Sequence, residues 1–442
     1  MISFIVFLFS FLFYYSRKDA EYIFCLIFLA TSGFGFLDTA NIFIKSEDLI
    51  VLSVVYVTLN EWMKDKKYFK IKSDIFGKTI LLILLFLFIQ YLRTILFKIE
   101  TPTFALKAIR HFLVLFLYFY LRRLKFKEFS RLTNLCLSAS LVQGVFFYLQ
   151  LFGLGGILTS RIDEATRYGE ITRYANYPLL AEFFSIYFMV NEKKNIFTRF
   201  FFIVIFIFMP VIGQARGAIL RVAIAIVIFF IIKRKVKYSI YIFIGALFFQ
   251  YVVNPMFEYR TRNRKENTFE EIMKVVKDPT GIYESYTSGN AGGTFAFRIA
   301  MLMERIYYIS DNPQYLPIGT GIIHEDSPNN KFIFKLGTRK EQFKSGRNVI
   351  GGADITWMQI ILLHGLVGVV IFMVLLFVWI KKGLPMIRKN SNPLLIASSL
   401  YSIVAFFQTF NGNYFHRIFT LLFLLVFIAV IRATSYINVE NK

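Results

Sequence analysis

Long, uninterrupted apolar runs constrain this chain more than any other feature of its sequence. Several approach or exceed the roughly 20 residues that an α-helix needs to cross a bilayer core about 30 Å thick. Hydrophobic residues make up 56% of the 442 residues and charged residues 18%, which is less charge than a soluble domain carries. The runs are continuously apolar, whereas membrane β-barrel strands alternate between lipid-facing and lumen-facing residues. The sequence therefore predicts an all-α polytopic membrane protein.

Apolar segments predict about 12–14 transmembrane helices. They lie at 1–15, 21–44, 48–63, 75–97, 104–121, 129–152, 178–190, 197–215, 217–232, 238–253, 355–380, 393–410 and 417–433. Three parts follow: about ten helices in 1–250, a polar insertion at 251–354, and about three helices in 355–442. Within the insertion, Thr268–Val276 and Phe295–Ser310 have helical apolar spacing. We expect short helices there, lying over the membrane mouth.

The net charge of +23 is explained by loops on one side of the membrane. In a soluble protein it would suggest nucleic acid, but a polytopic protein collects Lys and Arg in its cytoplasmic loops. With the spans above, the basic clusters at 64–72, 122–131, 193–199, 233–237 and 381–389 all fall on one side. That side is predicted to be the cytoplasm, with the C-terminus inside. The opposite side receives 153–177, 214–216, 251–354 and 411–414, and no nucleic-acid partner is expected.

Three arginines on the predicted outer side are candidates for phosphate recognition. Arg216 lies between two apolar runs, Arg298 opens an amphipathic stretch, and Arg305 follows seven residues later, so the last two can share a helix face. A guanidinium presents a planar fork of donors to phosphate oxygens. The alternatives are a snorkelling arginine at the interface and a solvated helix face.

The exit of the insertion offers a candidate base. Asp354 directly precedes a span, where it can serve as an N-cap, as a general base at the membrane surface, or as both. Trp357, one turn later, suits either the interfacial aromatic belt or a platform for a sugar. Gly319 and Gly321 surround Thr320 in a tight turn, which is either a plain turn or a close backbone approach to a ligand. Without a preceding strand and a following helix, this pair is no nucleotide motif.

The four histidines have no spacing typical of a metal site, so neither a metal nor a cofactor is expected. His324 lies in the insertion and is a candidate contact to substrate. His111, His364 and His416 lie in or near apolar spans and are interpreted as structural residues.

Three patches carry a family resemblance. The first is Gln214-Ala215-Arg216-Gly217-Ala218-Ile219-Leu220, and the second is Arg298 upstream of Gly319-Thr320-Gly321 in one long external loop. The third is Asp354-Ile355-Thr356-Trp357 followed by Gly365-Leu366-Val367-Gly368. Together they resemble the O-antigen polymerase and O-antigen ligase superfamily of bacterial envelope glycosyltransferases. Where ligases of that superfamily commonly carry a His-Asn pair, this chain has Asp354-Ile355, so the resemblance points to a polymerase.

The resemblance implies a GT-C-like fold in the bacterial inner membrane and a lipid-linked substrate. An acceptor hydroxyl would attack the anomeric carbon of a glycan on polyprenyl diphosphate, and the diphosphate would leave. Arg216 and Arg298 would stabilise its charge, with Arg305 as a weaker candidate, and Asp354 would accept the proton, with Glu304 or Glu325 as alternatives. Besides the bilayer and the polyprenyl-diphosphate-linked oligosaccharide, the expected partners are a chain-length regulator and a flippase.

Three other functions are also compatible with the sequence. An O-antigen ligase would transfer the glycan to a lipid A core instead. A flippase or other transporter would need polar residues lining its spans, whereas Lys78, Arg93 and Arg110 are the few charges noted there. A membrane scaffold for envelope assembly is the third reading.

Overall fold

The computed structural model describes most of the membrane-embedded chain. It describes 2–36, 45–71, 74–152, 166–168, 171–173, 178–213, 215–234, 273, 294–324, 327–329, 334, 355–389, 392–410, 412 and 414–440. Four predicted features lie outside these residues: the span at 238–253, the helix at Thr268–Val276 apart from Met273, the candidate base Asp354 and the alternative base Glu325.

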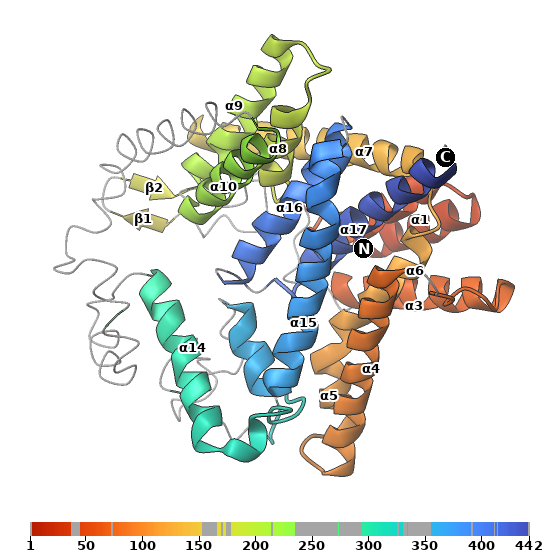
Figure 1. The fold of residues 1–442 in the computed structure, drawn as a ribbon, viewed down its shortest axis with the longest axis vertical. Helices are drawn as coiled ribbons and strands as arrows, with labels where there is room; N and C mark the ends of the chain where they lie inside the picture. Colours follow the sequence, from red (N-terminus) through yellow and green to blue (C-terminus); the bar gives the residue numbers. More distant parts are fainter. Residues whose placement is uncertain are drawn as a thin grey trace.

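Helices account for nearly all of the described structure (Figure 1). The N-terminal part contains α1 (Ile2–Tyr15), α2 (Asp19–Ala30), α3 (Ser46–Lys64), α4 (Ile75–Leu96), α5 (Pro102–Ile109), the 3-10 helix η1 (Arg110–Phe116), α6 (Leu117–Leu121), α7 (Phe126–Leu149), η2 (Gln150–Phe152), α8 (Ala181–Val190), α9 (Ile196–Ile212) and α10 (Arg216–Ile232). The C-terminal part contains α14 (Thr294–Asp311), η5 (Pro313–Tyr315), α15 (Thr356–Lys389), α16 (Pro393–Thr409) and α17 (Ile418–Glu440). Every predicted span that falls on described residues contains helix, and α14 confirms the helix predicted at Phe295–Ser310.

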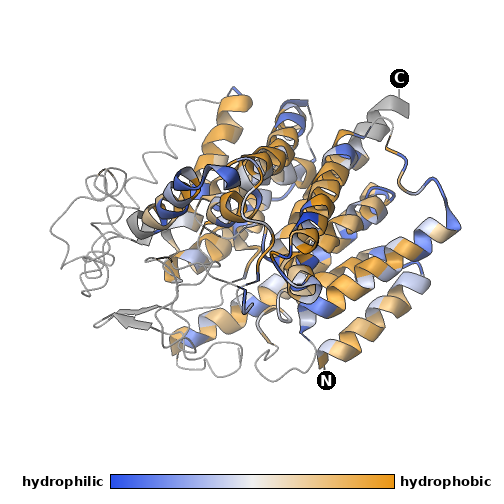
Figure 2. Cartoon of the chain, turned by 90° about the horizontal axis from the view of Figure 1, so that it is seen from below, coloured by the Kyte–Doolittle hydropathy of each residue, from blue (hydrophilic) through white to orange (hydrophobic). Residues whose placement is uncertain are grey.

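The hydropathy of these helices confirms the all-α polytopic membrane class. Within the described residues, four helical segments are long and apolar enough to cross a membrane: Ile75–Leu96, Pro102–Leu121, Phe126–Phe152 and Thr356–Lys389. Shorter apolar helices accompany them, including α1, α8, α9 and α16. Hydrophobic residues dominate the helices, and hydrophilic residues gather mainly at helix ends and in connections (Figure 2).

Local structure departs from the predicted spans in two places. The segment predicted as one helix at 104–121 is divided into α5, η1 and α6, and α2 ends at Ala30 instead of continuing toward 44. A short antiparallel ribbon interrupts the helical pattern, with β1 (Thr166–Tyr168) paired to β2 (Ile171–Arg173). These departures leave the fold class unchanged.

The largest departure is inside α15, where the chain reverses direction at Gly365 (Figure 1). The backbone of Gly365 has φ 65° and ψ −164°, a conformation that is open essentially only to glycine. Phe415 contacts both Trp357 and Phe372, with ring centroids 6.3 and 5.0 Å away. Those two residues would lie about 22 Å apart along a straight helix. The prediction of one continuous span at 355–380 is therefore wrong: 356–364 is a separate limb that doubles back beside 366–389.

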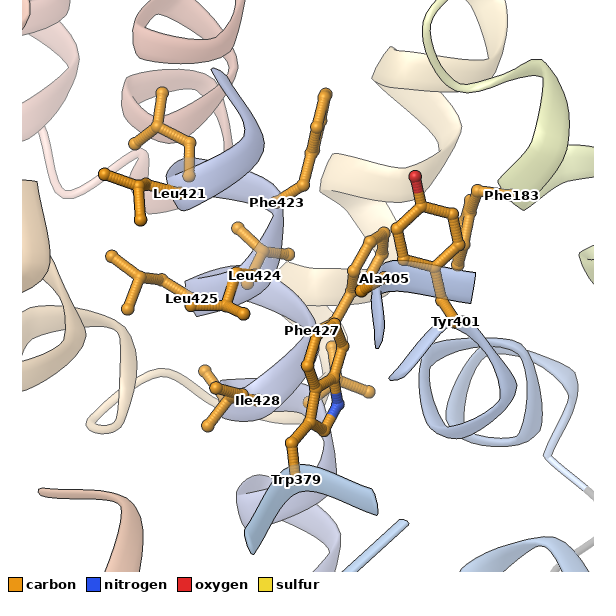
Figure 3. Packing of buried hydrophobic residues seen from close by; sticks show 14 of the residues in the cluster. Phe183, Trp379, Tyr401, Ala405, Leu421, Phe423, Leu424, Leu425, Phe427 and Ile428 are labelled. Atoms are coloured by element: carbon orange, nitrogen blue, oxygen red, sulfur yellow. The ribbon is translucent and has the colours of Figure 1, made fainter. Parts of the chain in front are cut away.

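Aromatic side chains from four helices form the core around α17 (Figure 3). Phe427 of α17 stacks on Phe183 of α8 at 4.6 Å and contacts Tyr401 of α16 at 4.9 Å. Trp379 of α15 is also stacked with Phe427, with their ring centroids 6.5 Å apart. These contacts fix how α8, α15, α16 and α17 lie against one another.

A buried carboxylate joins three helical segments at the predicted cytoplasmic end. Asp74 caps α4 by accepting a hydrogen bond from the Gly77 N–H at 3.1 Å. It also accepts a hydrogen bond from the Tyr118 hydroxyl at 2.8 Å. The guanidinium groups of Arg122 and Arg432 approach it at 3.3 and 3.2 Å. A buried carboxylate is stable only with such partners, so this cluster ties α4 to α6 and α17.

Candidate functional site

The turn at Gly319 and Gly321 is locked into the reversal of α15. Thr320 and Gly321 donate backbone hydrogen bonds to the carbonyls of Leu362 and Leu363, at 2.9 and 3.2 Å. Both glycines have positive φ, +71° at Gly319 and +98° at Gly321. A Cβ on Gly319 would lie 2.5 Å from the Leu363 carbonyl oxygen. Gly319 is therefore required by close contact with another backbone, and Gly321 by its positive φ, so the motif is accounted for without a ligand.

Helix α4 holds the other side of this turn. Arg93 donates to the carbonyl oxygens of Ile318 and Gly319 at 2.9 and 3.0 Å. The Thr94 hydroxyl accepts a hydrogen bond from the Ile322 N–H at 3.0 Å. The charge of Arg93 within a predicted span is thus used to bind the turn. As a result, the segment 318–322 of the polar insertion is anchored between α4 and α15.

The two arginines of α14 have different surroundings. Arg305 is fully buried, pairs with Glu304 at 2.6 Å, and places its guanidinium 4.0 Å from the Phe334 ring centroid. Burial lowers the pKa of Arg305 to about 10, against the opposing effect of Glu304, so it remains charged at neutral pH. Arg298 is half-buried. Arg305 is therefore enclosed by the protein, whereas Arg298 is partly exposed.

Thr356 and Trp357 attach the short limb of α15 to the connection between α16 and α17. The Thr356 hydroxyl donates to the Gly412 carbonyl at 2.8 Å and accepts from the Tyr414 N–H at 2.6 Å. The Trp357 indole N–H donates to the Thr409 hydroxyl at 3.0 Å. The Trp357 ring is 5% exposed, so in this structure it contributes packing and offers no open face to a sugar.

A polar pocket lies where α8, α10 and the α16–α17 connection meet; we call it the outer pocket. Its cavity volume is about 180 Å³. The residues lining it are Leu179, Glu182, Arg221, Tyr401, Gln408, Tyr414, Arg417, Phe419, Thr420 and Phe423. The start of α8, the first turns of α10 and the 411–414 connection are the ends that the charge pattern predicts on the outer side. The structure brings these three ends together.

The charges of the outer pocket come from residues far apart in the sequence. Arg221 donates two hydrogen bonds to the Glu182 carboxylate, at 3.1 and 2.6 Å. Both side chains are largely buried, with relative exposures of 11% and 7%. Arg417 is exposed and lines the same pocket. The pocket therefore holds one closely paired carboxylate together with two cations.

The predicted site residues are only partly brought together. Helix α10 begins at Arg216, five residues before Arg221, although the Arg216 side chain is outside the described residues. Arg298, Arg305 and His324 do not line the outer pocket. His324 lies in the segment after Gly321, with its ring 5.9 Å from Phe104 of α5.

Sequence reasoning missed the charged residues of the outer pocket. Glu182 and Arg221 both lie inside apolar helices, where an ionisable side chain is costly and therefore a candidate for function. That signal was present in the sequence, but Lys78, Arg93 and Arg110 were the charges noted within the spans, and Glu182 and Arg221 were overlooked. The sequence did not mark Arg417 as a candidate for function, because arginine is common in connections between two spans.

The three other histidines lie close to one another. The rings of His111 and His416 are 5.2 Å apart, and Phe372 lies 6.4 Å from His364. Burial, followed by the charges of His111 and His364, lowers the pKa of His416 well below its usual range. No group of three or more His, Cys, Asp or Glu side chains in the described part of the chain is arranged to hold a metal ion.

Comparison with known families now bears on this geometry. Residues 201–373 match the family model described as O-antigen ligase. This match is consistent with the O-antigen polymerase and ligase superfamily. No curated protein sequence matches the chain. The matched stretch runs from α9 through the reversal in α15 and includes Arg216, Arg221, Arg298 and the Gly319–Gly321 turn. Glu182 and Arg417 lie outside it, so the outer pocket combines residues of the matched stretch with residues from flanking segments.

Proposed function

We propose that this protein polymerises lipid-linked oligosaccharide repeat units into an O-antigen or capsule-type polysaccharide. The match to the O-antigen ligase family supports a glycan-transferring membrane enzyme but is common to polymerases and ligases. The presence of Asp354-Ile355 where ligases commonly have a His-Asn pair favours the polymerase. The observation that carries the proposal is the outer pocket, a polar cavity beside the first turns of α10 within a largely apolar helical protein.

The proposed reaction forms one bond and breaks one. The acceptor hydroxyl oxygen bonds to the anomeric carbon of the donor glycan, the bond from that carbon to the polyprenyl diphosphate breaks, and the hydroxyl proton passes to a base. Negative charge develops on the leaving diphosphate, so preorganised cations lower the barrier. We assign this role to Arg216 and Arg298, with Arg417 at the pocket mouth as an additional cation.

We assign the base to Asp354 because of its place in the chain. It precedes Thr356 by two residues, and two residues of extended chain reach about 7 Å at most. Thr356 is hydrogen-bonded to Gly412 and Tyr414, and Tyr414 lines the outer pocket. A base at this position is tethered beside the cavity in which the reacting hydroxyl would lie.

Other predicted contacts take supporting roles in this proposal. Gly319, Gly321, Arg305 and Trp357 form packing contacts that position the insertion and the α15 limb, and His324 remains a candidate contact to the glycan. We place the pocket on the outer side of the bacterial inner membrane, with a flippase delivering substrate to it and a chain-length regulator as a further partner.

Incubation of the purified protein with a polyprenyl-diphosphate-linked repeat unit tests the proposal. A ladder of longer lipid-linked glycans is the expected product. Transfer only to an added lipid A core would show a ligase, and movement across a vesicle bilayer without bond formation would show a flippase.

A matched pair of variants on α10 tests the cation. Arg216→Ala is expected to abolish the ladder, while Arg234→Ala, which removes an exposed arginine at the opposite end of the same helix, leaves it intact. Arg298→Ala is expected to behave like Arg216→Ala. Full activity in both Arg216→Ala and Arg298→Ala would refute the proposed diphosphate site.

A further inference from the structure

Two polar atoms of the outer pocket have no hydrogen-bond partner among the residues that the structure describes. They are the Gln408 side-chain oxygen and the Tyr414 hydroxyl, and both are buried. Tyr414 is 1% exposed. Buried polar atoms almost always have a partner, because leaving one unsatisfied is destabilising. Two such atoms in the lining of one cavity indicate that a ligand completes their hydrogen bonds.

The chemistry of the lining selects among ligands. The Gln408 oxygen and the Glu182 carboxylate only accept hydrogen bonds, whereas the Tyr414 hydroxyl can donate or accept. A phosphate would be attracted by Arg417, but Arg221 is already paired with Glu182, and phosphate oxygens cannot donate to the Gln408 oxygen or the Glu182 carboxylate. Sugar hydroxyls can donate to each acceptor and also accept from Tyr414. The lining therefore fits a polyol better than it fits the diphosphate.

The shape of the cavity agrees with this chemistry. Tyr401, Phe419 and Phe423 contribute aromatic walls, which suit the apolar faces of a sugar ring. The volume of about 180 Å³ is several times the roughly 30 Å³ that one water molecule occupies in the liquid. The space thus suits a single ring more than an extended chain or an isolated water.

We infer that the outer pocket binds one sugar ring of the acceptor glycan through its hydroxyl groups, with Gln408 and Tyr414 as the residues that select it. Its assignment to the acceptor rests on the proposed polymerase function, because Thr356 ties the segment that follows Asp354 to the wall of this pocket. The diphosphate then lies outside the cavity, toward Arg216.

Calorimetric binding of the free repeat-unit oligosaccharide, released from its lipid by mild acid, tests the inference without turnover. The purified full-length protein is expected to bind it, and Gln408→Leu and Tyr414→Phe are each expected to weaken binding about three- to tenfold, as loss of one hydrogen bond does. Inorganic pyrophosphate should not compete. Unchanged affinity in both variants, competition by pyrophosphate, or no binding by the wild type would each overturn the inference.

Thermal stability separates a ligand-binding role from a structural one. Because neither atom has a partner in the described part of the chain, both variants should retain the wild-type melting temperature without ligand. Tyr148→Phe is the matched control, since its hydroxyl donates to the Ile205 carbonyl at 2.6 Å and the residue does not line the pocket. The Tyr148→Phe control should have a lower melting temperature than the wild type and should bind the oligosaccharide with wild-type affinity. A lowered melting temperature in Tyr414→Phe with normal binding would overturn the inference.

The two proposals can fail separately. Oligosaccharide binding that is lost in the pocket variants, without any ladder from the lipid-linked substrate, would sustain the sugar site and refute the polymerase. If the wild-type protein forms a ladder but the pocket variants bind the oligosaccharide normally, the polymerase proposal is sustained and the sugar site is refuted.

Discussion

Replacement of Gly365 by alanine should destabilise the protein by disrupting the reversal of α15. Its φ of 65° and ψ of −164° lie in a region that costs other residues about 1–3 kcal/mol. A Cβ there would also lie 2.6 Å from the Ile318 nitrogen and 2.6 Å from the Pro317 carbonyl carbon. These are backbone atoms, which cannot rotate away, and overpacking of this kind adds about 1–3 kcal/mol. The expected loss in the free energy of unfolding is therefore about 2–6 kcal/mol.

The buried thiols provide the assay. Cys25 and Cys136 are both free and buried, so a thiol-reactive fluorogenic dye reports their exposure as the detergent-solubilised protein is heated. The Gly365→Ala protein should react at a temperature several degrees lower than the wild type, because a loss of this size shifts the midpoint by degrees.

Gly144→Ala is the control for Gly365→Ala, because it adds the same methyl group without backbone strain or a rigid neighbour. A Cβ on Gly144 would overlap the terminal methyl of Met209, which is the end of a flexible side chain, and the Gly144 backbone has no positive φ. This variant should lose much less stability than Gly365→Ala. Equal midpoints for the two variants would refute the argument that backbone strain and a rigid neighbour determine the loss.

Two further predictions concern titratable groups. Asp74→Asn removes the charge that Arg122 and Arg432 face, and breaking a buried ion-pair cluster from one side should lower stability by about 3–5 kcal/mol in the same thiol assay. His416 has a folded-state pKa well below its unfolded value of about 6.5, so only the unfolded state takes up its proton as the pH falls below that value. Stability should fall from about pH 6.5 downward by at most about 1.4 kcal/mol per pH unit from this group, and His416→Asn should reduce the slope of midpoint against pH. An unchanged slope in that variant would contradict the assignment.

The helical framework was readable from hydropathy alone. Continuous apolar runs must satisfy their backbone hydrogen bonds internally, so α4 and α7 were predicted nearly to their ends. The family resemblance at Arg216 and at Gly319-Thr320-Gly321 was equally visible, because it depends on short local patterns. These features are properties of neighbouring residues, and neighbouring residues are what a sequence displays.

The reversal at Gly365 was decided by tertiary structure. Hydropathy reports that 355–380 is buried in an apolar environment, but it carries no direction, and a glycine within an apolar run fits a continuous helix or a break equally well. The break exists because the backbone of the Gly319 turn occupies the space beside Gly365, with Arg93 holding that turn from α4. A contact between segments this far apart leaves no local pattern.

For the outer pocket, too, the sequence determined some features and the tertiary structure decided others. The sequence by itself determined that Glu182 and Arg221 are charges within apolar helices, each costly alone. Only the tertiary structure decided that they pair, and that Gln408, Tyr414 and Arg417 join them. The physical reason is that burial of a charge demands a partner but does not specify which one. The partner is selected by the packing of α10 against α8 and α16, and the aromatic core fixes how α8, α16 and α17 lie against one another.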